Sequence, residues 1–137
     1  MEMTNSLKTI IADNVNRLMD YHGGMVGKER MLPGDLAKLC RKNGGKTDQK
    51  TIWNVVNPDK SGNITTATIE SIAGVFNLEP YHLMIPNLPI EELTSRRLEK
   101  VIECYAQVTF ESRENIVRIA ENEVRYRTTE KTSINGG

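Results

Sequence analysis

Apolar positions in the first 90 residues recur at intervals of three and four, and short turn-forming segments separate them. This spacing places the apolar side chains on one face of a helix. The pattern, with its polar caps and its glycine and proline breaks, predicts four helices. They are expected over about Leu7 to Tyr21, from Leu32 or Pro33 onward, from Thr47 or Asp48 to Val56, and from Thr65 or Thr66 to Phe76. The expected fold is therefore all-α.

The third of these helices divides into an apolar face and a polar face. Ile52, Val55 and Val56 recur at i, i+3 and i+4, so we expect this side in the core. The polar side holds Gln49, Lys50, Thr51 and Asn54. Gln and Asn can pair bidentately with adenine in the major groove, and Lys can reach guanine acceptors or phosphates. The polar face is either a solvated surface or a DNA-reading surface.

Two neighbouring side chains of this helix allow two interpretations each. Trp53 either packs under the glycine turn that precedes the helix or lies against a sugar and a thymine methyl group. Packing is the more frequent fate of a lone Trp. Thr51 either contacts a thymine methyl group or only supports the helix.

The order of these segments resembles the helix-turn-helix of the phage repressor and Cro family. The resemblance covers about residues 7–86. Its ordered segments are Asn14–Met19, Asp35–Cys40, Gln49–Val56 and Thr68–Met84, with Leu-Ala at 36–37 and Ile-Ala at 72–73 matching the first motif helix and the closing helix. The resemblance implies a repressor-like bundle of about five helices. It also implies that the third helix reads bases, through Gln49, Lys50, Thr51, Asn54 and Trp53.

The turn between the two motif helices is longer than in that family. Ala37 and Ile52 are fifteen positions apart, whereas the usual turn takes about three or four residues. The surplus, Arg41–Thr47, is interpreted as an extended helix end, a Gly-Gly stop and a longer turn. Residues 23–31 likewise lengthen the connection after the first helix.

Positive charge is concentrated around the candidate reading helix, although the formal net charge of the chain is zero. Between Lys28 and Lys60 there are eight Lys or Arg residues and four acids, whereas eight bases and nine acids follow residue 87. Local positive charge of this kind suits phosphate contact. The expected phosphate contacts are Lys42 and Lys46, together with Lys60, Ser61 and Asn63 from the loop that runs beside the DNA backbone in the resembled family. An ordinary exposed turn is the alternative for that loop.

A second region begins after a proline-marked linker at residues 87–92. Apolar residues at helical spacing predict two more helices with a break at Thr109, which is typical of a helical hairpin. Its expected oligomerisation residues are Leu98, Val101, Ile102, Tyr105, Ile116, Ile119 and Val124. Two isolated amphipathic helices bury little surface, so the hairpin must pack on the first domain or on another copy. The expected division is a DNA-binding domain over 1–88, an oligomerising hairpin over 89–127 and a disordered tail over 128–137.

Other chemistries have little support in the sequence. Cys40 and Cys104 are too few for a disulfide framework, and His22 and His82 lack partners at metal-ligand spacing. There is no signal peptide and no apolar run near the ~20 residues of a membrane span, so a cytoplasmic location in a bacterial host is expected. No catalytic set or phosphate-binding glycine loop is found, and neither enzymatic activity nor a cofactor is expected.

The expected function is sequence-specific binding of double-stranded DNA by a transcriptional regulator. The resemblance implies a phage or prophage repressor that occupies an operator as a homodimer or higher oligomer. The alternative is an antitoxin-like protein-interaction module that regulates its own operon. The self-cleaving peptidase of larger repressors is not expected, because the 50 residues after Asn87 are too short and too helical to contain it.

Overall fold

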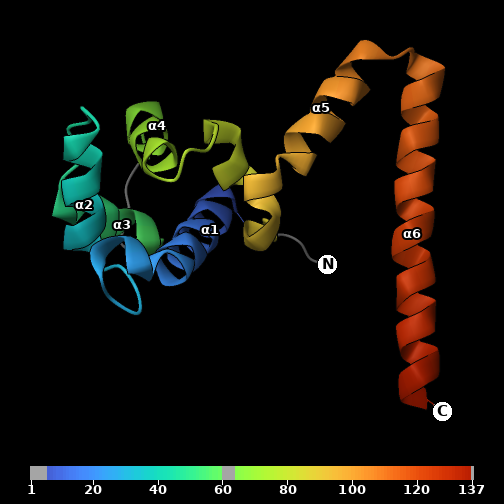
Figure 1. The fold of residues 1–137 in the computed structure, drawn as a ribbon, viewed down its shortest axis with the longest axis horizontal. Helices are drawn as coiled ribbons and strands as arrows, with labels where there is room; N and C mark the ends of the chain where they lie inside the picture. Colours follow the sequence, from blue (N-terminus) through green and yellow to red (C-terminus); the bar gives the residue numbers. More distant parts are fainter. Residues whose placement is uncertain (1–5, 60–63, 137) are drawn as a thin grey trace. The chain divides into compact units, whose positions relative to one another are not determined.

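The computed structural model describes the backbone of residues 6–59 and 64–136, and the side chains of these residues apart from 94–95 and 127–136 (Figure 1). Within these residues it contains six α-helices, three 3₁₀ segments and no strand, which confirms the all-α prediction. The chain divides into two compact units, Met1–Ile90 and Glu91–Gly137. Lys60, Ser61 and Asn63, three expected phosphate contacts, lie outside the described residues.

The first unit is built from four α-helices in the predicted order. They are α1 (Leu7–Tyr21), α2 (Pro33–Lys42), α3 (Gln49–Val56) and α4 (Thr66–Val75), with 3₁₀ segments η1 (Gly23–Val26) and η2 (Pro80–Met84). Where a bundle of about five helices was expected, the described part of this unit contains four α-helices and these two short segments. Helix α2 contacts α3 and α4, while α1 contacts α3 and η2, so one core joins all of them. Its fully buried side chains include Ile11, Val15, Leu18, Leu36, Ile52, Ile72 and Leu83.

Side-chain caps start three of these helices. The hydroxyl of Ser6 accepts a hydrogen bond from the N–H of Thr9, and that of Thr65 from the N–H of Thr68. At α3 the cap is Asp48, whose carboxylate accepts from the N–H of Thr51 at 2.8 Å. Thr47, the other candidate cap of α3, is instead buried. Local side-chain chemistry therefore sets where each of these helices begins.

The Gly-Gly stop after α2 forms as predicted. Gly44 adopts a left-handed φ of +93°, and its N–H donates to the carbonyl of Arg41 while that of Gly45 donates to Cys40. This pair of bonds is a Schellman motif, which satisfies the last carbonyls of the helix. A Cβ on Gly45 would lie 2.6 Å from Oγ of Ser71 in α4. The turn is therefore packed against α4, and this contact fixes the path of the longer connection.

Buried polar side chains of α1 hold both ends of the bundle together. Asn14, fully buried, donates from Nδ2 to the carbonyls of Leu83 at 2.8 Å and Ile85 at 2.9 Å. Asn16 donates to the carbonyl of Val56 at the end of α3. These bonds attach both the end of α3 and the segment around η2 to α1, since buried carbonyls need donors.

The second unit contains η3 (Ile90–Ser95), α5 (Arg97–Gln107) and α6 (Phe110–Gly136). Thr109 caps α6 by accepting from the N–H of Ser112 at 3.2 Å, as the predicted break requires. Helices α5 and α6 are both present, but they diverge from their two-residue connection and do not pack along their lengths as a closed hairpin (Figure 1). Within the described residues, no side chain of α5 is fully buried.

Helix α6 also continues through residues 128–136, where a disordered tail was expected. Neither proline nor glycine interrupts the sequence before Gly136, so no strong helix breaker ends the helix earlier.

Candidate nucleic-acid interface

Helix α3 turns one face into the core and leaves the other at the surface. Ile52 and Val55 are buried against the scaffold, as predicted. Gln49 and Lys50 are exposed and Asn54 is half-buried. The polar side chains expected to read bases therefore share one accessible side of a single short helix.

Trp53 lies on this accessible side as well. Its side chain is 45% exposed, so the packed alternative, favoured for a lone Trp, is wrong. The helical spacing explains this position, because residue 53 is one step past the buried Ile52 and four past Gln49. The accessible side of α3 therefore combines polar hydrogen-bonding groups with one large aromatic surface.

Thr51 is placed differently from the other candidates. It is half-buried at the edge of α3, and its N–H is engaged by the Asp48 cap. The hydrogen bonds from Thr51 hold the pKa of the Asp48 carboxyl below its usual value. This position beside the cap favours the interpretation that Thr51 stabilises the start of α3 over the interpretation that it contacts a base.

The side chain of Gln49 rests against the first turn of α2. A Cβ built on Gly34 would lie 3.2 Å from Oε1 of Gln49 and 3.4 Å from its Cδ. Glycine at position 34 thus gives room for this amide. Within the described residues Gln49 makes no hydrogen bond, so both its N–H₂ and its carbonyl are available to a ligand. No pattern in the sequence predicted this contact, which joins positions fifteen residues apart.

The cations of the basic stretch fall into two groups. Lys28 and Arg30 are neutralised by ion pairs with Asp35 at 2.9 Å and Asp20 at 3.0 Å. Backbone and Lys28 hydrogen bonds keep the pKa of the Asp35 carboxyl below its usual value, so this pair stays charged. The remaining described cations are exposed and form no ion pair with any described residue: Lys38, Arg41, Lys42, Lys46 and Lys50. The unneutralised charge therefore follows α2, its C-terminal turn and the start of α3.

Two members of this second group, Lys38 and Arg41, were not selected from the sequence. They are three positions apart on α2, and Lys42 follows at four, so all three share one helix face. That spacing was visible in the sequence. Only the structure distinguishes these cations from the paired Lys28 and Arg30.

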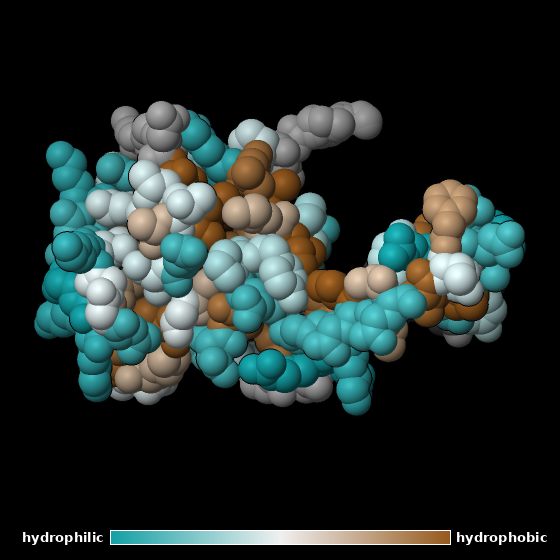
Figure 2. All heavy atoms as spheres, turned by 90° about the horizontal axis from the view of Figure 1, so that it is seen from above, coloured by the Kyte–Doolittle hydropathy of each residue, from teal (hydrophilic) through white to brown (hydrophobic). Residues whose placement is uncertain are grey.

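The expected oligomerisation residues lie in α5 and α6. Leu98 and Ile116 are half-buried. The others are exposed: Val101, Ile102, Tyr105, Ile119 and Val124. Figure 2 shows apolar atoms at the surface of this unit. Five of the seven expected oligomerisation residues are therefore exposed.

Other kinds of site find no support in the described part of the chain. No group of three metal-ligating side chains occurs there, and no helix there has the length and apolar character to cross a membrane. Both cysteines are free thiols. Burial raises the pKa of Cys40 to about 11, so this thiol is unreactive near neutral pH.

Comparisons with models of protein families, with curated proteins and with solved structures found no match for this chain.

Proposed function

We propose that this protein is a sequence-specific regulator of transcription that binds double-stranded DNA through α3. The observation that carries the proposal is the composition of its accessible face. Gln49, Lys50 and Asn54 offer the donors and acceptors that discriminate base edges, and Trp53 offers an apolar surface beside them. An α-helix with its side chains is about 10–12 Å in diameter, which fits a major groove about 12 Å wide.

The unpaired cations supply the sequence-independent part of binding. Lys42 and Lys46 flank the turn that leads into α3, and Lys38 and Arg41 share the adjacent face of α2. Contact between these groups and phosphates would release counterions and fix the register of α3 on the duplex. The protein would then act as a repressor of the phage or prophage type, by occupying an operator and excluding polymerase.

Selection of bound sequences from a random pool of double-stranded DNA tests this function. The expected result is enrichment of one motif, with Lys50→Ala weakening or changing the enrichment. Lys100→Ala is the matched control, because Lys100 is an exposed lysine of α5 in the other unit. Failure of the full chain to enrich any sequence would contradict the proposal.

The exposed apolar residues of α5 and α6 favour a second candidate function. A protein-interaction module of the antitoxin kind would use that surface to mask a partner, and would use α3 to regulate its own operon. A motif enriched only when a co-expressed neighbouring gene product is present would favour this function over a free-standing repressor.

A further inference from the structure

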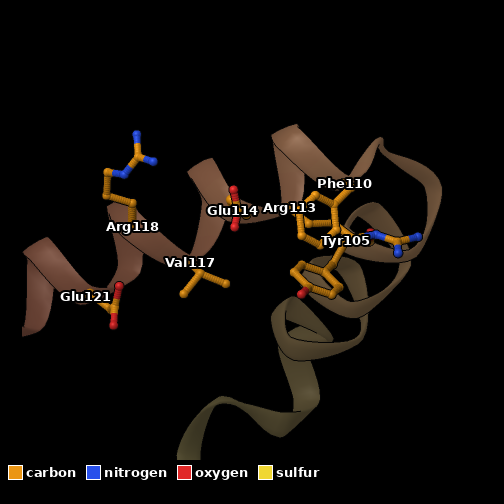
Figure 3. Close-up of a pocket in the computed structure, with 7 residues that line it drawn as sticks. All are labelled: Tyr105, Phe110, Arg113, Glu114, Val117, Arg118 and Glu121. Atoms are coloured by element: carbon orange, nitrogen blue, oxygen red, sulfur yellow. The ribbon is translucent and has the colours of Figure 1, made fainter.

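The corner between α5 and α6 is held by one arginine. Arg113 donates from Nε to the carbonyl of Tyr105 at 2.8 Å and from Nη2 to that of Ala106 at 2.9 Å. Its guanidinium also lies 5.5 Å from the centre of the Tyr105 ring (Figure 3). The two hydrogen bonds satisfy carbonyls in the last turn of α5, to which no N–H of the same helix donates. The ring contact adds a cation–π attraction. Together with the Thr109 cap, these contacts fix the turn in its open form.

An open corner leaves a groove between the end of α5 and the first turns of α6. Its volume is about 430 Å³. Tyr105, Phe110 and Val117 line it with apolar surface, and four charged side chains also line it: Arg113, Glu114, Arg118 and Glu121 (Figure 3). Phe110 is 72% exposed, which is a high exposed fraction for a phenylalanine in a folded protein. The apolar side of the groove is therefore open to solvent within the described residues.

The exposed apolar surface of this unit is large enough for a stable interface. Six large apolar side chains on the α5 stripe and the groove face of α6 are each at least 40% exposed: Val101, Ile102, Tyr105, Phe110, Val117 and Val124. If each offers on the order of 100 Å², they total roughly 600 Å² per copy, and two copies reach about 1,200 Å², the lower end of the range for specific interfaces. Monomeric proteins rarely expose apolar patches above about 300–600 Å².

We propose that a second copy of this chain covers this surface, with α5 of one copy lying along α6 of the other. The apolar stripe of α5 and the groove on α6 belong to the same chain and are both exposed within the described part of residues 91–137, so two copies can cover both reciprocally. Such an exchange closes a two-fold dimer. The eleven residues of α5 span about 16 Å, within the roughly 22 Å of α6 from Phe110 to Val124. The pairing is a property of residues 91–137 and does not require DNA.

The mass of the full chain in solution, measured by sedimentation without DNA, is the first test. The expected result is a dimer. Ile102→Glu in the α5 stripe and Val117→Glu in the groove should each give a monomer. Lys100→Glu and Asn122→Glu place the same charge on the opposite face of each helix and should leave the dimer intact. Protection of the buried Cys40 thiol in each variant verifies that the first unit remains folded.

Mixing the two monomeric variants separates helix exchange from simpler pairing. In an exchanged dimer, one α5–α6 contact of the mixed pair contains no substitution, so the mixture should recover a heterodimer at a weaker affinity. Pairing of α5 with α5 and α6 with α6 would leave every contact with one substituted partner, and the mixture would stay monomeric. A monomeric full chain at about 100 µM, a dimer that survives Ile102→Glu, or a mixture without recovery would each overturn the proposal.

Discussion

Removal of two unpaired cations from the candidate interface should lower the salt dependence of DNA binding. Lys42 ends α2 and Lys46 follows in the turn before α3, and neither forms an ion pair with a described residue. Each is therefore expected to displace a counterion from the duplex on binding. Lys42→Ala combined with Lys46→Ala removes both contacts and leaves the core unchanged, since both side chains are exposed.

The expected size of the effect follows from counterion release. Each phosphate contact contributes about 0.9 to the slope of log K against log salt, so the double variant should lose about 1.8 units. Between 50 and 200 mM salt, the affinity of the parent should therefore fall by roughly 12-fold more than that of the variant. Fluorescence anisotropy of a labelled duplex, titrated at five salt concentrations, measures both slopes directly.

A paired lysine of the same basic stretch serves as the control. Lys28 is bound to Asp35 through both carboxylate oxygens, at 2.9 and 3.1 Å, so Lys28→Ala should leave the slope near that of the parent. The reasoning would be refuted if the double variant kept the parent's slope. A fall of the same size in Lys28→Ala would also refute it, because pairing would then not distinguish the two groups of cations.

Three further predictions concern the scaffold. Asn14→Ala should lower the free energy of unfolding in urea by about 2–4 kcal/mol, because two backbone carbonyls lose their donor; a loss below 0.5 kcal/mol, roughly the least one hydrogen bond contributes, would contradict this role. Gly45→Ala should destabilise the same transition by about 1–3 kcal/mol through overlap with α4, whereas Gly74→Ala, with no atom near its added Cβ, should stabilise by about 0.5–1 kcal/mol. In native protein a thiol reagent should modify Cys104 and spare Cys40 at pH 8, with both reacting in denaturant; equal native rates would show that Cys40 is not protected.

The helices of the first unit could be predicted because local signals determine them. The bounds of α1 follow from one apolar stripe with a serine cap before it and a glycine pair after it. These signals lie in the helix or within a few residues of its ends. The choice between Thr47 and Asp48 as the cap of α3 could not be made locally. It depends on the burial of Thr47, which requires the rest of the fold.

The parts that the sequence did not predict depend on contacts between distant segments. The exposure of Trp53 depends on which neighbours cover the flank of α3, and the resting place of Gln49 depends on a glycine in another helix. The angle between α5 and α6 depends on Arg113, whose side chain reaches back across the corner. Periodicity shows that a helix has an apolar face, but it does not show whether that face is covered by the same chain.

The most direct test of the central claim, that α3 reads bases, is a competition assay over all single-base variants of a selected operator. Gln49→Ala should lose preference at one base pair per half-site and keep nonspecific affinity, since a bidentate contact contributes about 1–3 kcal/mol of discrimination. Gln107→Ala, an exposed glutamine of α5, is the matched control and should keep the parent's full profile. If Gln49→Ala keeps that profile too, the accessible face of α3 does not read bases through Gln49.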